Sequence, residues 1–98
     1  MALYLIQHVH TAETCPTRNP DMVRALRGHV TADNAQRMGL SLVADWVNEP
    51  EHTVVLVVEA DSQQKAEDFA APFRQVGSVS VKAGETCEQV ARVCLGEA

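Results

Sequence analysis

Four stretches of the chain have the apolar pattern of β-strands. They are residues 3–10, 40–47, 53–60 and 78–83. The third stretch is apolar and β-branched almost throughout, which predicts a central strand. In the last stretch apolar and polar residues alternate, which is typical of a half-exposed strand near the edge of a sheet.

Three further stretches repeat apolar residues at helical spacing. They are residues 19–39, 61–73 and 86–95. The first begins at Asn19 and Pro20, a favourable cap followed by a proline in the first turn, and the glycine at 28 predicts a bend. Pro72 ends or kinks the second helix. The third opens with a capping box from Thr86 to Gln89.

The order of these elements predicts the fold. Strand, helix, strand, strand, helix, strand and a terminal helix give an α+β chain of the ferredoxin-like βαββαβ type, forming a single domain over residues 1–98. One antiparallel sheet would carry two helices on one face. Because the central strands are apolar on both faces, we expect a homodimer that pairs two sheets face to face. Within the sheet, we expect the third strand to run parallel beside the first.

Two segments resemble a known group of proteins. Residues 58–73 (VEADSQQKAEDFAAPF) with 76–81 (VGSVSV), and residues 4–16 (YLIQHVHTAETCP), resemble short bacterial domains of unknown function. Those domains look like relatives of the dimeric α/β-barrel superfamily. The resemblance implies a ferredoxin-like chain that pairs sheet to sheet. It implies no reaction, because unrelated activities occur on that fold.

Composition narrows the classes of partner. The 98 residues carry a formal net charge of −5, which argues against a nucleic-acid partner, since phosphates favour clustered basic residues. No apolar run is long enough to cross a membrane, and the first residues lack the basic start of a secretion signal. Three cysteines do not suggest a disulfide framework. We therefore expect free thiols and a cytoplasmic location.

One cluster of residue types suggests chemistry. His8 and His10 point to the same side of the first strand with Cα atoms roughly 6.6 Å apart, and Cys15 follows in the adjoining loop. Imidazole and thiolate ligands favour Zn, Cu or Ni over Mg or Ca. With a parallel third strand, Glu59 would lie nearby as a further ligand or as an acceptor for a histidine N–H. The sequence thus predicts a small cytoplasmic protein that binds a transition metal ion.

The remaining histidines, cysteines and nearby carboxylates are weaker candidates for metal ligands. Asp61 and Glu13 are alternatives to Glu59 as the carboxylate. The same expected topology places His52, in the turn before the third strand, at the opposite end of the sheet from His10. His29 lies on the first helix, and like His52 it receives no predicted role. Cys87 and Cys94 are seven residues apart on the terminal helix, too distant to share an ion, and are predicted to pack.

Three alternatives remain open at this point. His8 and His10 are also compatible with a plain polar rim, and Cys15 with a buried loop anchor. A second function is a small-molecule binder or enzyme, whose pocket would include Tyr4 and Trp46 beside Ile6 and Leu56. In that case His8 or His10 would be the acid–base group, with no other catalytic residue assigned. A third is an assembly module that pairs through the edge strand at 78–83.

Overall fold

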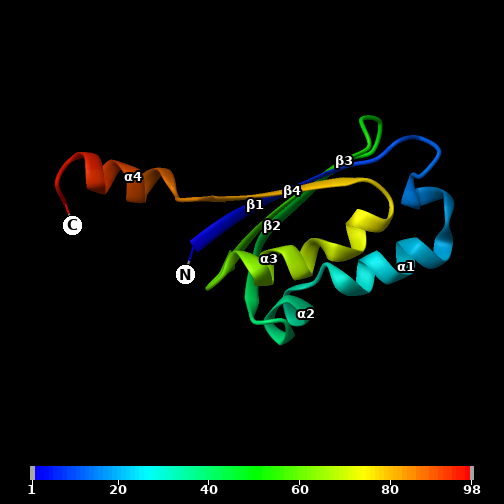
Figure 1. The fold of residues 1–98 in the computed structure, drawn as a ribbon, viewed down its shortest axis with the longest axis horizontal. Helices are drawn as coiled ribbons and strands as arrows, with labels where there is room; N and C mark the ends of the chain where they lie inside the picture. Colours follow the sequence, from blue (N-terminus) through cyan, green and yellow to red (C-terminus); the bar gives the residue numbers. More distant parts are fainter. Residues whose placement is uncertain (1, 98) are drawn as a thin grey trace.

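A four-stranded antiparallel sheet with helices on one face forms the body of the molecule (Figure 1). The computed structural model describes residues 2–97. The strands are β1 (Ala2–Val9), β2 (Leu40–Asn48), β3 (Thr53–Ala60) and β4 (Ser78–Gly84), in the spatial order β2-β3-β1-β4. This order is the ferredoxin-like arrangement, and it confirms the predicted α+β fold.

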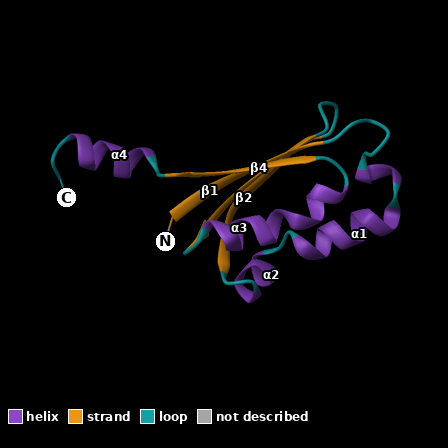
Figure 2. Cartoon of the chain, in the orientation of Figure 1, coloured by secondary structure: helices purple, strands orange, loops and turns teal. Residues whose placement is uncertain are grey.

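The helical segments alternate with the strands as predicted (Figure 2). The α-helices are α1 (Pro20–His29), α2 (Ala32–Arg37), α3 (Gln63–Ala70) and α4 (Cys87–Cys94), and 3-10 turns cover Pro16–Arg18 and Ala71–Gln75. The Asn19 side chain accepts hydrogen bonds from two backbone N–H groups at the start of α1. Ser62 caps α3, and Thr86 and Gln89 form the predicted capping box of α4. Local sequence thus sets where each helix begins.

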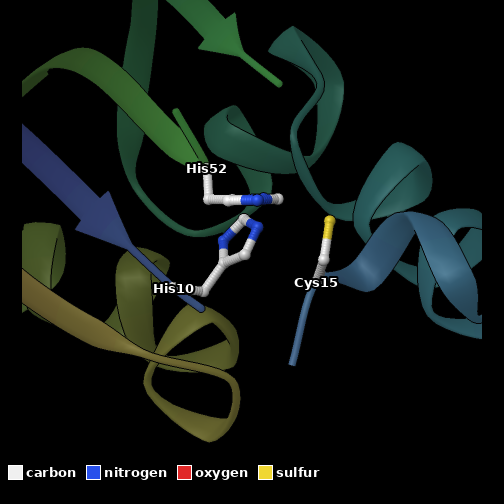
Figure 3. Close-up of side chains that lie close together, drawn as sticks. All are labelled: His10, Cys15 and His52. Atoms are coloured by element: carbon white, nitrogen blue, oxygen red, sulfur yellow. The ribbon is translucent and has the colours of Figure 1, made fainter. Parts of the chain in front are cut away.

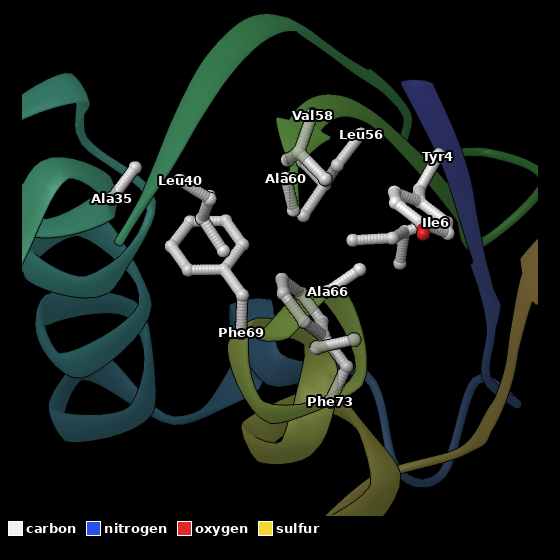
Figure 4. Packing of buried hydrophobic residues seen from close by; sticks show 11 residues of the cluster. Tyr4, Ile6, Ala35, Leu40, Leu56, Val58, Ala60, Ala66, Phe69 and Phe73 are labelled. Atoms are coloured by element: carbon white, nitrogen blue, oxygen red, sulfur yellow. The ribbon is translucent and has the colours of Figure 1, made fainter. Parts of the chain in front are cut away.

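The core lies between the sheet and the covering helices (Figure 4). Tyr4, Ile6 and His8 of β1 are buried on this face, as the alternation of that strand predicts. Phe69 of α3 and Phe73 of the following 3-10 turn pack against the sheet. His8 is therefore a polar side chain built into an otherwise apolar layer, and it needs internal hydrogen-bond partners.

The direction of β3 corrects one expectation. It runs antiparallel to β1, with Leu3 opposite Glu59 and Val9 opposite Thr53. The expectation of a parallel pair was wrong because a hairpin reverses the chain between β2 and β3, while β2 runs in the same direction as β1. Glu59 consequently lies at the far end of the sheet from His10, about 20 Å along the strand at 3.3 Å per residue.

The second face of the sheet carries exposed apolar side chains. Leu5 is 42% exposed, Val9 41% and Trp46 52%. Trp46 pairs with Val55 on this open face, whereas Tyr4 is buried on the helix-covered face. The expectation that Tyr4 and Trp46 line one pocket within the chain was therefore wrong. A bulge in β2 between Leu42 and Ala44 shifts the side-chain alternation of that strand.

Helix α4 projects away from the body beyond β4 (Figure 1). All of its residues are exposed, including Cys87 and Cys94, so the prediction that these two cysteines pack was wrong. Val93 and Leu95 are 75% and 71% exposed, which leaves an apolar stripe without a covering element in the described chain. Among residues 2–97, no helix has both the length and the apolar character that crossing a membrane requires.

Candidate functional site

Two histidines and a cysteine meet at the end of the sheet where β1 finishes and β3 begins. The backbone N–H of His10 donates a hydrogen bond to the carbonyl of His52 at 3.1 Å. One possible ligand atom from each of His10, Cys15 and His52 lies within 4.8 Å of the others. Figure 3 shows the Cys15 sulfur facing the two imidazole rings. The expectation that His52 lies at the opposite end was wrong for the same reason as the placement of Glu59.

A tight turn brings Cys15 back to the end of β1. The backbone N–H of Thr14 donates to the carbonyl of Thr11 at 3.2 Å, and the hydroxyl of Thr14 accepts from the N–H of Thr11. Cys15 then stands at the residue before the 3-10 turn that begins at Pro16. Its side chain is buried, and its sulfur lies 2.9 Å from the hydroxyl of Thr17. The loop thus holds a shielded thiol against the histidines.

The β2–β3 hairpin presents His52 from the other side. The Asn48 side chain accepts a hydrogen bond from the N–H of Glu51, and the N–H of His52 donates to the carbonyl of Glu49 at 3.0 Å. His52 has a φ of 52°, in the left-handed region that glycine adopts most easily. A histidine here costs about 1 kcal/mol of backbone strain relative to glycine.

His8 and His10 form a hydrogen-bonded relay that fixes the tautomer of each ring. His8 Nδ1 lies 2.9 Å from the carbonyl oxygen of Ser78, which can only accept, so His8 Nδ1–H donates. The neutral His8 ring then accepts at Nε2 from His10 Nδ1, 3.0 Å away. The lone pair of His10 is left on Nε2. The relay therefore directs an unprotonated nitrogen toward the cluster.

Two ring nitrogens in the cluster are buried without a hydrogen-bond partner among the described residues. They are His10 Nε2 and His52 Nδ1. A buried polar atom without a partner costs about 1–3 kcal/mol, so native proteins seldom retain one without compensation. Both atoms belong to rings whose centroids are 5.1 Å apart. The cluster thus contains unused ligand atoms.

Electrostatics keep the relay uncharged. Burial lowers the pKa of His8 below its usual 6.5, against the opposing effect of the hydrogen bond to Ser78. Burial also lowers the pKa of His10, and the nearby His8 and His52 lower it further by charge repulsion. Near neutral pH both rings are therefore neutral, which is the form that binds metal ions.

Gly77 makes room for this arrangement. A Cβ atom at this position would lie 2.3 Å from the Val9 carbonyl oxygen, 2.8 Å from His8 Cε1 and 2.9 Å from His10 Cβ. Any side chain at residue 77 would therefore push the start of β4 away from the two histidines. The sequence places this glycine only at the start of a strand, and nothing in its context indicates the close approach.

The donor set matches a tetrahedral transition-metal site with three protein ligands. Zinc binds imidazole at about 2.0–2.1 Å and thiolate at about 2.3 Å, so its ligand atoms stand roughly 3.3–3.6 Å apart. The three ligand atoms lie within 4.8 Å of one another, so side-chain rotations that shift each atom by about 1 Å bring them to that spacing. The ring N–H of His10 already donates to His8, the outer interaction that metal-binding histidines usually make.

The other candidate residues lie elsewhere. Both ring nitrogens of His8 are engaged, so its place is behind His10 and not in the three-residue group. Asp61 pairs with Lys65 at 3.1 Å near the Glu59 end of the sheet. Glu13 is exposed in the loop before Cys15. His52 is the residue that sequence reasoning missed, and the correct hairpin direction was the signal that would have found it.

A solvent-facing cavity opens onto the cluster. It has a volume of about 350 Å³, and both Cys15 and His52 line it. Arg18 and Glu49 stand at its wall. An ion therefore has a path from solvent to the buried thiol without any movement of the sheet.

Comparison with protein families places this chain beside other sequences. A family model described as "Domain of unknown function (DUF3303)" matches residues 5–96. A search of curated proteins finds no match. The family match covers every residue of the cluster.

Proposed function

Since the chain belongs to the DUF3303 family, whose function is unknown, we propose its role from its own residues: it is a small protein that binds a transition metal ion. The ligands are His10, Cys15 and His52, and His8 supports His10 from behind. The ion is of the Zn, Ni or Cu type, because two imidazoles and one thiolate form a borderline-soft donor set.

One observation carries the proposal. His10 Nε2 and His52 Nδ1 are buried without partners in the described chain, beside a buried thiol. An ion would satisfy both nitrogens at once and turn a destabilising arrangement into a stabilising one. The strained backbone of His52 supports this interpretation, because strain persists where a side chain is needed at that place.

Three protein ligands leave a fourth position for water or another molecule. Structural zinc sites usually have four protein ligands, whereas open sites bind or activate small molecules. The proposed site is therefore suited to exchange, sensing or chemistry more than to a purely structural role. A free thiol ligand also requires a reducing compartment, and we place the protein in the cytoplasm on this ground.

Metal content of untagged protein, purified without chelator, tests the proposal. Elemental mass spectrometry should find close to one Zn, Ni or Cu per chain, or one equivalent taken up on addition of Zn²⁺. His29→Ala is a matched control, because it removes a histidine outside the cluster. Protein that takes up none of the three ions would contradict the proposal.

We also propose that two copies of the chain pair through the open face of the sheet. Leu5, Val9 and Trp46 are exposed apolar residues on this face. Glu59 and Lys82 lie on the same face, opposite Leu3 and Leu5 of β1 respectively. In a two-fold pair, Lys82 of one copy can meet Glu59 of the other, so the face is complementary to itself in charge as well as in polarity.

Light scattering tests the pairing. The wild-type mass should be that of a dimer, and Trp46→Lys should shift it toward the monomer. Val23→Lys is a control, because Val23 is also an exposed apolar residue but lies on α1, on the other side of the sheet. A wild-type monomer at high concentration would contradict the proposal.

A further inference from the structure

A second cavity adjoins the cluster on its inner side. It is a cleft of about 400 Å³ between α1 and the sheet, within the usual size range of small-molecule sites. Its walls are apolar: Val23, Leu26, Val30, Val47, Val54 and Phe73. His8 and His10 also line this cleft. The two imidazoles therefore lie where the cleft meets the cluster, and the deeper walls of the cleft are mostly hydrocarbon.

His10 belongs to both the cleft and the three-residue cluster. Cys15 and His52 line the solvent-facing cavity instead, and Thr17 lines both cavities. An ion held by His10 would therefore stand between the two cavities. A molecule in the cleft could reach it without displacing any protein ligand.

We infer that the cleft binds a compact apolar molecule with one terminal oxygen, and that this oxygen occupies the fourth position of the metal ion. Phenols and enols are the chemical class that fits, because they combine a hydrocarbon body with an oxygen that zinc binds well. The contact to the ion rests on the proposed function, whereas entry of the hydrocarbon body does not.

The walls of the cleft also indicate how polar its ligand can be. Arg27 and Asp45 line it and are both exposed, so charged groups lie only where the cleft meets solvent. Leu56 and Phe73 are buried beneath it, with exposures of 1% and 4%. A charge carried deep into the cleft would lose its hydration without a partner, which disfavours polar ligands with several charged groups.

A pair of probes that differ by one oxygen tests the inference. Para-ethylphenol and ethylbenzene are titrated against zinc-loaded and metal-free protein, with binding followed by NMR and zinc content measured on the same samples. Para-ethylphenol should bind zinc-loaded protein at least tenfold more tightly than metal-free protein. Ethylbenzene should bind both forms equally, and nuclear Overhauser contacts should connect its ethyl group to methyl groups of Leu26 and Val54.

Two tryptophan variants locate the binding. Val47→Trp should fill the cleft and weaken both probes more than tenfold, and a 61% exposed residue tolerates the change. Val43→Trp is the matched control, because Val43 is exposed on the same strand and does not line the cleft. Binding that is insensitive to Val47→Trp, or no binding of either probe, would overturn the inference.

The outcomes also separate this inference from the proposed function. If the protein binds zinc but zinc loading does not raise the affinity for para-ethylphenol, the inference is wrong and the metal site stands. If zinc does not bind while ethylbenzene enters the cleft, the metal site is wrong, and the oxygen contact is wrong with it.

Discussion

His29 and the cluster of His10 and His52 show how the same residue type can be used in two ways. His29 Nε2–H donates to the carbonyl of Phe69 at 2.6 Å, and its Nδ1 lies 3.2 Å from the amide nitrogen of Asn34. Its ring also stacks on Phe69. In the cluster, His10 Nε2 and His52 Nδ1 have no such partners in the described chain.

The two regions differ in how many imidazole nitrogens have hydrogen-bond partners. Both nitrogens of His29 are used, Nε2 in joining α1 to α3 and Nδ1 in joining α1 to α2, so this residue holds the helices together and has no nitrogen to offer a ligand. In the cluster, His10 uses Nδ1 in the relay through His8 to Ser78, whereas its Nε2 and the Nδ1 of His52 have no hydrogen-bond partner in the described chain. The number of histidines in a sequence is therefore less informative than the number of imidazole nitrogens left without a partner.

Zinc affinity should separate His29 from the cluster most strongly. His10→Ala should weaken Zn²⁺ binding more than about 100-fold, because loss of an outer partner alone costs about 10–100-fold and His10 is a direct ligand. His29→Ala should leave the affinity unchanged. Competition with a chelator of known affinity measures both variants, and equal losses in the two would remove the distinction.

Stability should show the reverse order. His29→Ala should lower the free energy of unfolding by about 2 kcal/mol, since the Phe69 carbonyl loses its donor and the ring stack disappears. His10→Ala in metal-free protein should cost less, because it removes one hydrogen bond, to His8, and also removes a buried Nε2 that has no partner in the described structure. Urea unfolding of metal-free samples provides the measurement. A larger loss for His10→Ala would mean that the cluster is structural.

His52→Gly should separate stability from binding within one residue. The variant should make metal-free protein equally stable or up to about 1 kcal/mol more stable, because glycine adopts the left-handed conformation without strain. Zinc binding should be lost. Thermal unfolding with and without Zn²⁺ tests both expectations. His52→Asn is the control, since asparagine tolerates this backbone but provides no imidazole. A destabilised, zinc-binding glycine variant would refute the assignment.

The stability of metal-free protein should depend weakly on pH. The pKa values of His8 and His10 lie below 6.5 in the folded chain, whereas both residues titrate near 6.5 when unfolded. Below about pH 6.5 the unfolded state therefore binds more protons, and the free energy of unfolding falls as the pH drops toward the folded pKa values. Above that pH these two groups contribute no slope. His8→Phe should flatten the profile, and an unchanged profile would contradict the buried neutral relay.

Much of the fold followed from the sequence because the signals are local. Asn19, Ser62 and Thr86 each cap the helix that their context predicts, and strand 53–60 has the predicted bounds. The exposure of Trp46 and of α4 was not predicted, because the spacing of apolar residues shows which face of an element is apolar but not what covers that face. Apolar residues on α4 predict a packed helix, yet in the described chain no element covers them.

The site was predicted only in part, because it depends on strand direction. His8, His10 and Cys15 are close in sequence, so their proximity needed only the alternation of β1 and a loop that turns back. His52 and Glu59 stand at opposite ends of β3, and the direction of that one strand decides which of them approaches His10. Gly77 acts through a close approach between β4 and β1 that no sequence motif marks.

Titration with Co²⁺ tests whether Cys15 and the two histidines bind a metal ion together, because a thiolate bound to cobalt gives a charge-transfer band in the near ultraviolet. Wild-type protein should develop this band up to one equivalent of Co²⁺, together with the intense visible bands of a tetrahedral ion. The band should vanish in Cys15→Ser and persist in the Cys87→Ser/Cys94→Ser variant, whose exposed thiols lie on α4. A wild-type protein without the band, or a Cys15→Ser variant that keeps it, would contradict the site.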